Sequence, residues 1–166
     1  MINTKLPIEL IELVLARFFN FQQNIIVPKV SYGYFATHEA DLLICSKFGY
    51  LTEIEIKRSW TDFLADFKKN TTHDECKVMW KYFAVPASIS EKVIQHIMSN
   101  NFVDWGVISF TDNCILKIER TPNNITKHDK EKKLTAEEQL KIARLGCMRY
   151  WSSENKKDFN IKVERL

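Results

Sequence analysis

Two β-like runs joined by a short loop constrain the fold more than any other part of the chain. Residues 39–46 and 50–59 are rich in alternating apolar and polar side chains, and Lys47, Phe48 and Gly49 separate them. Glycine readily adopts the left-handed backbone conformation that closes a three-residue hairpin loop. The sequence therefore predicts an antiparallel hairpin with Gly49 in that position.

The register of this hairpin determines which side chains meet. A three-residue loop pairs the residues directly before and after it, and the pairing then continues outward one residue at a time. Counting back places Asp41 opposite Glu55, and two residues further out Glu39 faces Lys57. Because side chains alternate between faces, these four ionisable groups share one face. The other face is apolar and carries Ala40, Leu42, Ile44, Ile54 and Ile56.

The ionisable face predicts a metal-dependent site. Charged side chains are seldom found in a buried sheet unless they are paired or bind a metal. The facing carboxylates of Asp41 and Glu55 repel each other unless a cation lies between them, and carboxylate oxygens suit Mg²⁺ or Mn²⁺. The ammonium of Lys57 can hold an attacking water or stabilise the charge of a transition state. The implied reaction is hydrolysis of a phosphodiester.

The rest of the chain predicts the α/β class, with a mixed sheet flanked by helices in a single domain over residues 1–166. Apolar spacing and Pro or Gly boundaries separate the elements. In chain order we expect a helix over 7–19, a strand over 24–34, the hairpin, a helix over 60–69, a strand over 77–85, a helix over 90–98, strands over 105–110 and 114–119, an exposed lysine-rich loop over 122–133 and a helix over 135–151. Pro28 indicates that the first strand lies at an edge of the sheet or carries a bulge.

Polar residues at three helix starts predict caps. Ser59 or Thr61 can cap the helix after the hairpin, and Ser90 can cap the helix that begins there. Thr135 and Glu138 match a capping box, in which each side chain accepts a hydrogen bond from the backbone N–H of the other residue. We therefore expect these residues to fix where the helices begin.

Length and composition indicate an ordinary soluble protein. A chain of 166 residues fits one domain, and 45% hydrophobic with 27% charged residues is typical of globular proteins. The net charge of +3 favours polyanionic partners only weakly. Glu9 and Glu12 interrupt the N-terminal apolar stretch, and no apolar run is long enough for a bilayer, so we expect a cytoplasmic protein without a signal peptide.

The four cysteines also favour a reducing compartment. Cys45, Cys76, Cys114 and Cys147 lie more than 30 residues apart, without the dense spacing of a disulfide framework. We expect Cys45 and Cys114 to be buried, because they lie in apolar runs. His73 and Cys76 have a spacing found in zinc sites, but no second pair completes four ligands.

The hairpin carries a resemblance to a known group of enzymes. The string EADLLICSKFGYLTEIEIKRS resembles the core of the PD-(D/E)XK nuclease superfamily, in which an Asp on one strand precedes Glu-X-Lys on its hairpin partner. The predicted order over residues 7–85 agrees with the αβββαβ core of that superfamily. The segments EADLLI, EIEIKRSWTDFLADFKKN and KYFAVP are similar to MmcB-like bacterial DNA-repair proteins and to related uncharacterised phage and bacterial proteins. The resemblance covers about half of the chain.

The resemblance implies roles for individual residues. Asp41 and Glu55 would be metal ligands, and Lys57 the catalytic lysine. In resolvase-like members a Glu of the first helix joins the site, which here is Glu12 or Glu9. We favour Glu12 because it lies deeper in the helix.

Residues around this set have open roles. The narrower family often carries Arg residues ahead of the Asp, where this chain has His38 and Glu39. Glu39 is then either a metal ligand or a group that supports one. Arg58, Lys68 and Lys69 are candidates for contacts with nucleic-acid phosphates, and Lys68 and Lys69 can equally belong to a solvated helix face.

Further basic residues near the C-terminus are compatible with two roles. The loop over 127–133 and Lys141, Arg144 and Arg149 on the last helix can extend a DNA-contact surface. Equally, they can be ordinary solubilising charge.

The sequence as a whole therefore predicts a Mg²⁺- or Mn²⁺-dependent endonuclease that acts on duplex or branched DNA, in DNA repair, recombination or the processing of phage or mobile elements. A homodimer is compatible with that activity. One rival is an inactive nuclease-fold module that binds nucleic acid or a protein partner. Another is a protein-interaction protein without a nucleic-acid role, for which the low net charge is the best argument.

Overall fold

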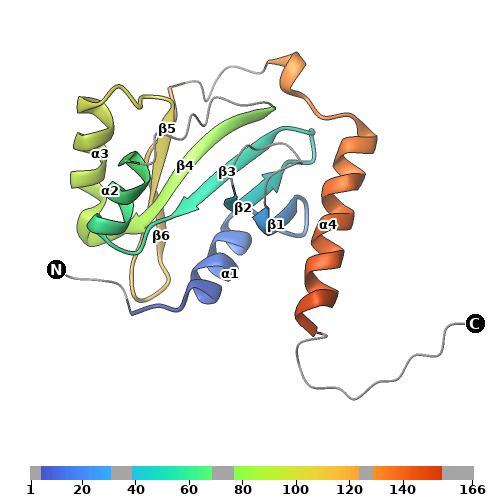
Figure 1. Ribbon diagram of the computed structural model, residues 1–166, viewed down its shortest axis with the longest axis horizontal. Helices are drawn as coiled ribbons and strands as arrows, with labels where there is room; N and C mark the ends of the chain where they lie inside the picture. The colour runs from blue at the N-terminus through green and yellow to red at the C-terminus, as the bar shows by residue number, and fades with distance from the viewer. Residues whose placement is uncertain (1–4, 31–38, 69–76, 124–128, 155–166) are drawn as a thin grey trace, which may run out of the picture.

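The chain follows the predicted alternation of helices and strands. A computed structural model describes residues 5–30, 39–68, 77–123 and 129–154. The elements are α1 (Ile8–Phe18), β1 (Ile25–Val30), β2 (Ala40–Cys45), β3 (Leu51–Ile56), α2 (Trp60–Lys68), β4 (Val78–Pro86), the 3₁₀ turn η1 (Ala87–Ile89), α3 (Ser90–Ser99), β5 (Trp105–Phe110), β6 (Leu116–Arg120), the 3₁₀ turn η2 (Lys130–Lys132) and α4 (Ala136–Glu154) (Figure 1). The predicted α/β class is confirmed.

The described strands form one mixed sheet in the order β1-β2-β3-β4-β5-β6. The β1–β2, β2–β3 and β5–β6 pairs are antiparallel, whereas β3–β4 and β4–β5 are parallel. Parallel neighbours require a crossover connection, and α2 and α3 lie in these two connections. Pro28 lies in β1 at an edge of the sheet, as its missing N–H predicts.

The hairpin has the predicted register. Leu42 pairs with Ile54, and the backbone N–H of Ser46 donates to the carbonyl of Tyr50 at 2.9 Å. Gly49 has a φ of 85°, which is the left-handed conformation expected for closing the loop. Pairing between the two strands extends outward from the loop as far as Leu42 and Ile54, so the predicted pairs of Asp41 with Glu55 and of Glu39 with Lys57 lie beyond the paired part of the hairpin.

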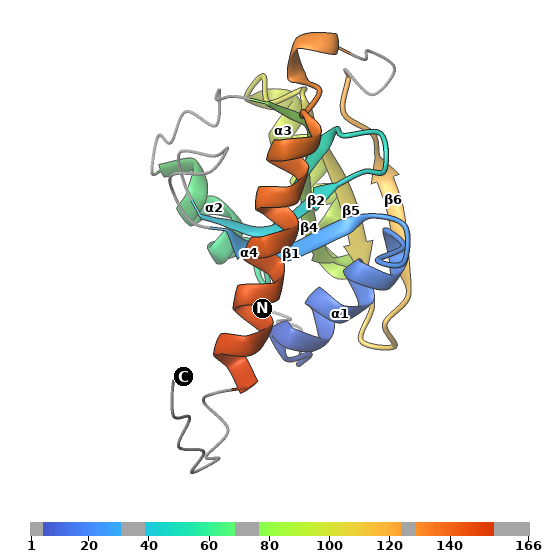
Figure 2. The same cartoon turned by 90° about the vertical axis from the view of Figure 1, so that its right-hand side faces the viewer.

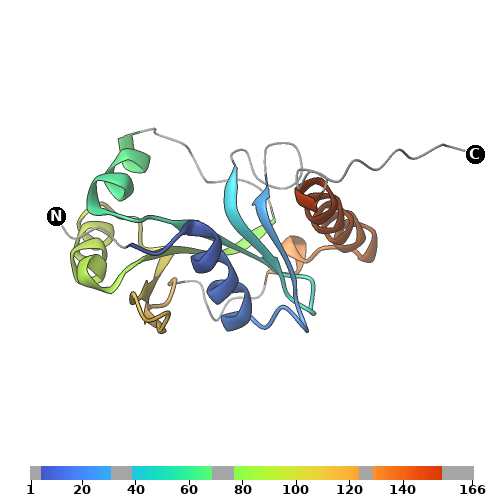
Figure 3. The same ribbon diagram turned by 90° about the horizontal axis from the view of Figure 1, so that it is seen from below.

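Helices cover both faces of the sheet. The apolar face of the hairpin packs against Ile11 and Leu15 of α1. On the opposite face, α4 packs on Leu43 and Leu51, while α2 and α3 pack on Phe83 and its neighbours. Figure 3 shows α4 at one end of the sheet and α2 and α3 at the other, and Figure 2 shows α4 lying across β1. The charged residues of β3 lie between these two apolar clusters.

Two of the three predicted caps are confirmed. The Ser59 hydroxyl accepts from the N–H of Asp62 at 3.1 Å, at the start of α2. Thr135 and Glu138 form the capping box, with bonds of 2.8 and 3.2 Å. The prediction for Ser90 is wrong, because η1 leads directly into α3 and the Ser90 hydroxyl instead donates to a carbonyl of η1.

The predicted burial of the cysteines is correct at one position. Cys45 is fully buried in β2. Cys114 is half-buried, because it lies in the turn before β6 with a φ of 60° rather than inside a strand. Among the described helices, none is long and apolar enough to cross a membrane.

Replacing Gly49 with alanine is expected to destabilise the protein by about 1–3 kcal/mol. An alanine is strained in the left-handed backbone conformation, and its Cβ would crowd the neighbouring atoms. That Cβ would lie 3.0 Å from the carbonyl oxygen of Leu134 and 2.9 Å from the side chain of Gln139. Urea denaturation measures the change. Gly49→Asn is the control, because asparagine tolerates this conformation but brings the same Cβ. Equal stability of Gly49→Ala and the wild type would contradict the requirement for glycine at this position of the loop.

Candidate active site

The site lies where β2 and β3 separate. Pairing between the two strands reaches Leu42 and Ile54 and goes no further, although β2 begins at Ala40 and β3 ends at Ile56. Beyond that point Ala40 pairs with β1 and Ile56 pairs with β4. The Asp41 carboxylate fills the opening, because its Oδ2 accepts the backbone N–H of Ile56 at 2.7 Å. A side chain of β2 thus replaces a backbone acceptor and is fixed at this opening.

Glu55 and Lys57 form a buried ion pair beside it. The side chains are two residues apart on the same face of β3, and Lys57 Nζ donates to Glu55 Oε2 at 2.8 Å. Only 7% of each side chain is exposed. The backbone N–H of Lys57 donates to the carbonyl of Ala84 at 2.9 Å, which holds this end of β3 against β4. Both groups are therefore held in one arrangement by the sheet itself.

Burial and neighbouring charges raise the pKa of Glu55 to about 7. The largest cause is desolvation, which disfavours the charged carboxylate. The negative charges of Asp41 and Glu53 act in the same direction, while Lys57 opposes them. A carboxyl group with a pKa near neutrality can accept or release a proton at physiological pH.

Of the two α1 carboxylates, Glu12 is the one placed at the site. It is half-buried, whereas Glu9 is exposed. Burial raises the pKa of Glu12, the charge of Lys29 lowers it, and the negative charges of Glu9 and Asp41 raise it further. Glu12 Oε1 is buried and accepts no hydrogen bond from the residues the structure describes. Glu12 therefore lies close enough to Asp41 for the two carboxylates to interact electrostatically.

The remaining predicted residues lie around this set or outside the described ranges. Glu39 is exposed directly before β2, and Arg58 is exposed directly after Lys57. Lys68 is the last residue of α2. His38, Lys69, His73 and Cys76, which the sequence analysis also names, lie outside the described residues.

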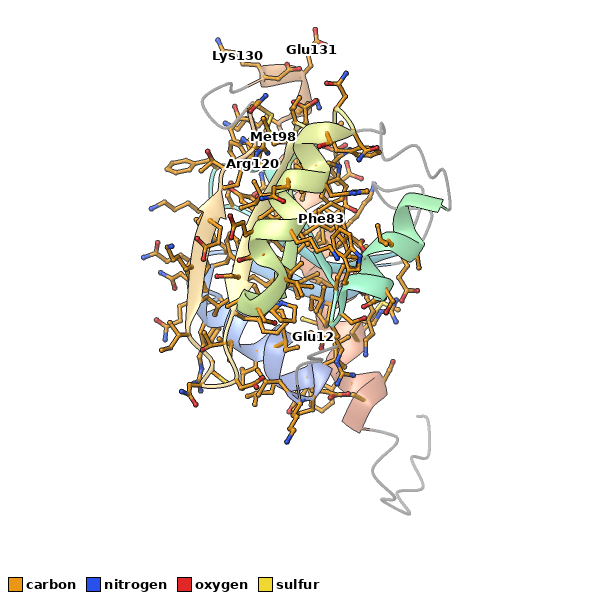
Figure 4. The ribbon with its side chains drawn as sticks, turned by 90° about the vertical axis from the view of Figure 1, so that its left-hand side faces the viewer. Glu12, Phe83, Met98, Arg120, Lys130 and Glu131 are labelled. Carbon is orange, nitrogen blue, oxygen red and sulfur yellow. The ribbon has the colours of Figure 1, made fainter. Side chains whose placement is uncertain are left out.

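The basic C-terminal residues are divided between two ends of the molecule. Lys130 and Glu131 lie well away from Glu12 (Figure 4), and Lys132 donates to the carbonyl of Val78 at the start of β4. Lys141 is paired with a glutamate of its own helix at 2.9 Å, and Arg144 is exposed.

Arg149 lies at the site end instead, where it donates to the carbonyl of Lys29 at 2.6 Å. Among the described basic residues of this group, Arg149 is therefore the one that the structure connects to the site.

Three charged residues near the site had not been singled out from the sequence. Glu53 is 1% exposed and pairs in register with Lys81 of β4. The alternation along β3 indicated the face of Glu53, but the Lys81 pairing depends on a parallel strand that only the fold supplies. Lys29 lies opposite the site in β1, with its ammonium 3.9 Å from Glu12 Oε1.

The carboxylates fit a hard divalent cation better than zinc. Among the described residues, no group of three or more His, Cys, Asp or Glu side chains is placed to hold a metal ion, so the four protein ligands of a structural zinc site are not present there. Mg²⁺ is usually held by one or two carboxylates, with water and substrate phosphate completing its coordination. Asp41 and Glu55 supply two such groups. The pKa of Glu55 is raised mainly by desolvation and further by the charge of Asp41, and a cation would favour the charged form of Glu55.

Comparisons with known proteins support the fold and give no information about activity. No family model matches the chain, and no curated protein matches it. Among solved structures, the chain is similar to "SPO1766 protein of unknown function from Silicibacter pomeroyi", with a TM-score of 0.56 and 16% sequence identity. The match covers 90% of this chain and 92% of that one. At this identity the likeness establishes that the two chains share a fold.

Proposed function

We propose that the protein is a Mg²⁺- or Mn²⁺-dependent endonuclease that hydrolyses phosphodiester bonds of DNA. The observation that carries this proposal is the meeting of Asp41, Glu55 and Lys57 at the opening between β2 and β3. Two carboxylates and a lysine, held by a rigid sheet, match what hydrolysis of a phosphodiester requires. The resemblance of residues 39–59 to the PD-(D/E)XK superfamily supports the same reaction.

The residues divide the chemistry among them. Without a metal, Glu55 takes up a proton near neutral pH because its pKa is raised to about 7, and a bound cation would favour its charged form. The ammonium of Lys57 is positioned by Glu55 and can donate to a water or to a phosphate oxygen. A divalent cation at Asp41 and Glu55 would supply positive charge to the phosphate and acidify the attacking water. Glu12 approaches from α1 and can accept a hydrogen bond from that water.

Cleavage of supercoiled plasmid and of branched oligonucleotides tests this function. With Mg²⁺ or Mn²⁺ the wild type is expected to nick DNA, and EDTA is expected to stop it. Asp41→Asn keeps an oxygen that can accept the Ile56 N–H but removes the charge, so it should fold and lose activity by about a hundredfold or more. Asp104→Asn, an exposed residue before β5, is the matched control. Equal nicking by the wild type and Asp41→Asn would refute the assignment.

A second function is favoured by one observation. Glu55 and Lys57 already neutralise each other at 2.8 Å, as a purely structural ion pair would. A nuclease-fold module that binds nucleic acid or a protein partner without cleaving it is compatible with that arrangement. DNA binding that persists in EDTA, together with calorimetry that detects no Mg²⁺ or Mn²⁺ binding, would favour this module over the enzyme.

A further inference from the structure

The edge strand β1 is irregular beside the site. Pro28 pairs with Leu42 and Val30 pairs with Ala40, so that Lys29 occupies the position opposite Asp41. The pairing is interrupted there, because Lys29 has a φ of 52°. A left-handed conformation is uncommon for a long side chain and persists only where the surrounding structure holds it. Such strain is concentrated at functional sites in proteins.

A contact from the distant end of the chain holds this irregularity. Arg149 of α4 donates to the carbonyl of Lys29 at 2.6 Å, across 120 residues of sequence. The adjoining part of β1 is anchored by the same helix, because Val27 and Val30 pack in one cluster with Ile142 of α4. The backbone of Lys29 is therefore fixed from the α4 side, and its conformation is part of the tertiary structure.

The side chain of Lys29 lies at the rim of the carboxylate site. Its Nζ is 3.9 Å from Glu12 Oε1, at the outer limit of an ion pair. Of the two side chains, Lys29 is 48% exposed and Glu12 only 15%. The ammonium thus lies on the solvent side of a buried carboxylate that also interacts with Asp41. An ion pair of this length is weak when its lysine is half-exposed to water, so the ammonium can contact an incoming anion instead.

We propose that Lys29 binds a backbone phosphate of the nucleic acid next to the carboxylates, and that Arg149 is the positioning residue that presents it. This proposal rests on the proposed function, because it assigns the substrate contact of the same site. A lysine at this rim offsets the repulsion between the substrate phosphate and Asp41, Glu55 and Glu12. Lysine serves as a point charge for phosphate, which suits a backbone contact without base preference.

The test measures affinity and salt dependence with defined DNA. The probes are a fluorescently labelled duplex and a four-way junction, with Ca²⁺ in place of Mg²⁺ to slow cleavage. Lys29→Gln is expected to weaken binding about tenfold and to reduce the slope of log K against log salt by about one. Lys29→Arg should retain most of the affinity. In nicking assays with Mg²⁺, Lys29→Gln should raise KM and change kcat by less than about twofold.

Matched variants separate charge, backbone and position. Lys29→Gly keeps the left-handed backbone without strain and should bind as weakly as Lys29→Gln. Lys47→Gln removes an exposed lysine from the hairpin loop at the other end of the strands and should bind like the wild type. Arg149→Gln should weaken binding as Lys29→Gln does, the double variant should be no weaker than either, and Arg149→Lys should restore part of the affinity.

The role of Lys29, the role of Arg149 and the nuclease activity are each contradicted by a different result. Wild-type affinity and salt slope in Lys29→Gln would overturn the role of Lys29, while nicking by the wild type would leave the nuclease intact. Wild-type affinity in Arg149→Gln would overturn the positioning role alone. Binding that depends on Lys29 without any cleavage would retain the phosphate contact and refute the enzyme. A wild type that binds neither probe would overturn both proposals.

Discussion

Replacing Lys57 with methionine is expected to lower kcat for Mg²⁺-dependent nicking by about 10²- to 10³-fold, the usual cost of removing one donor to a developing negative charge. The side chain is buried and held by Glu55, so its loss should affect the transition state more than the affinity for DNA. The measurement is single-turnover nicking of plasmid, with the affinity for DNA determined separately.

Two controls make this result specific. Lys57→Arg keeps the charge, but its planar guanidinium cannot occupy the position of an ammonium, so it should recover little activity. Lys47→Met removes an exposed lysine and should be fully active. Thermal unfolding checks that Lys57→Met folds, which is expected because an unpaired Glu55 can take up a proton. A kcat within about threefold of the wild-type value would show that Lys57 does not take part in the reaction.

The metal-free protein is expected to lose stability as the pH rises from about 4.5 to about 7. The pKa of Glu55 is about 7 in the folded chain, against an ordinary value of 4.5. In that range the folded state binds more protons than the unfolded state, so the free energy of unfolding falls with rising pH. The difference between the two pKa values corresponds to about 3 kcal/mol at about 1.4 kcal/mol for each pH unit.

Urea denaturation in EDTA across this pH range measures the effect. Glu55→Gln mimics the protonated side chain, so it should remove most of the slope and be the more stable protein above about pH 7. Glu9→Gln, an exposed change on α1, should leave the slope unchanged. Saturating Mg²⁺ should stabilise the wild type and not Glu55→Gln, because binding favours the charged carboxylate. Parallel pH profiles of wild type and Glu55→Gln would show that Glu55 titrates normally.

Local sequence was sufficient to predict the hairpin and the face of the sheet on which each of its side chains lies. Gly49 limits the loop to three residues, and strict alternation then assigns every side chain of β2 and β3 to a face. That register correctly places Leu42 opposite Ile54, one residue inside Asp41 and Glu55. The capping box of Thr135 and Glu138 was predictable for the same reason, because both partners lie within one helical turn.

Local sequence was not sufficient where a neighbour in space is distant in the chain. The cap predicted at Ser90 failed because η1 precedes α3 without a break. The choice between Glu9 and Glu12 depended on how α1 rotates against the sheet, which spacing along one helix does not determine. The raised pKa of Glu55 likewise depends mainly on burial, which only the tertiary packing produces.

The sequence by itself determined the class of the fold and the register of the hairpin, and it placed Glu55 and Lys57 side by side on one face. These depend on periodicity and on a turn, which act over a few residues. Only the tertiary structure decided that β2 and β3 separate at Asp41, that Lys81 lies beside Glu53 and that Arg149 reaches Lys29. Strand order and helix docking are set by packing between segments up to 120 residues apart, and no local pattern encodes that contact.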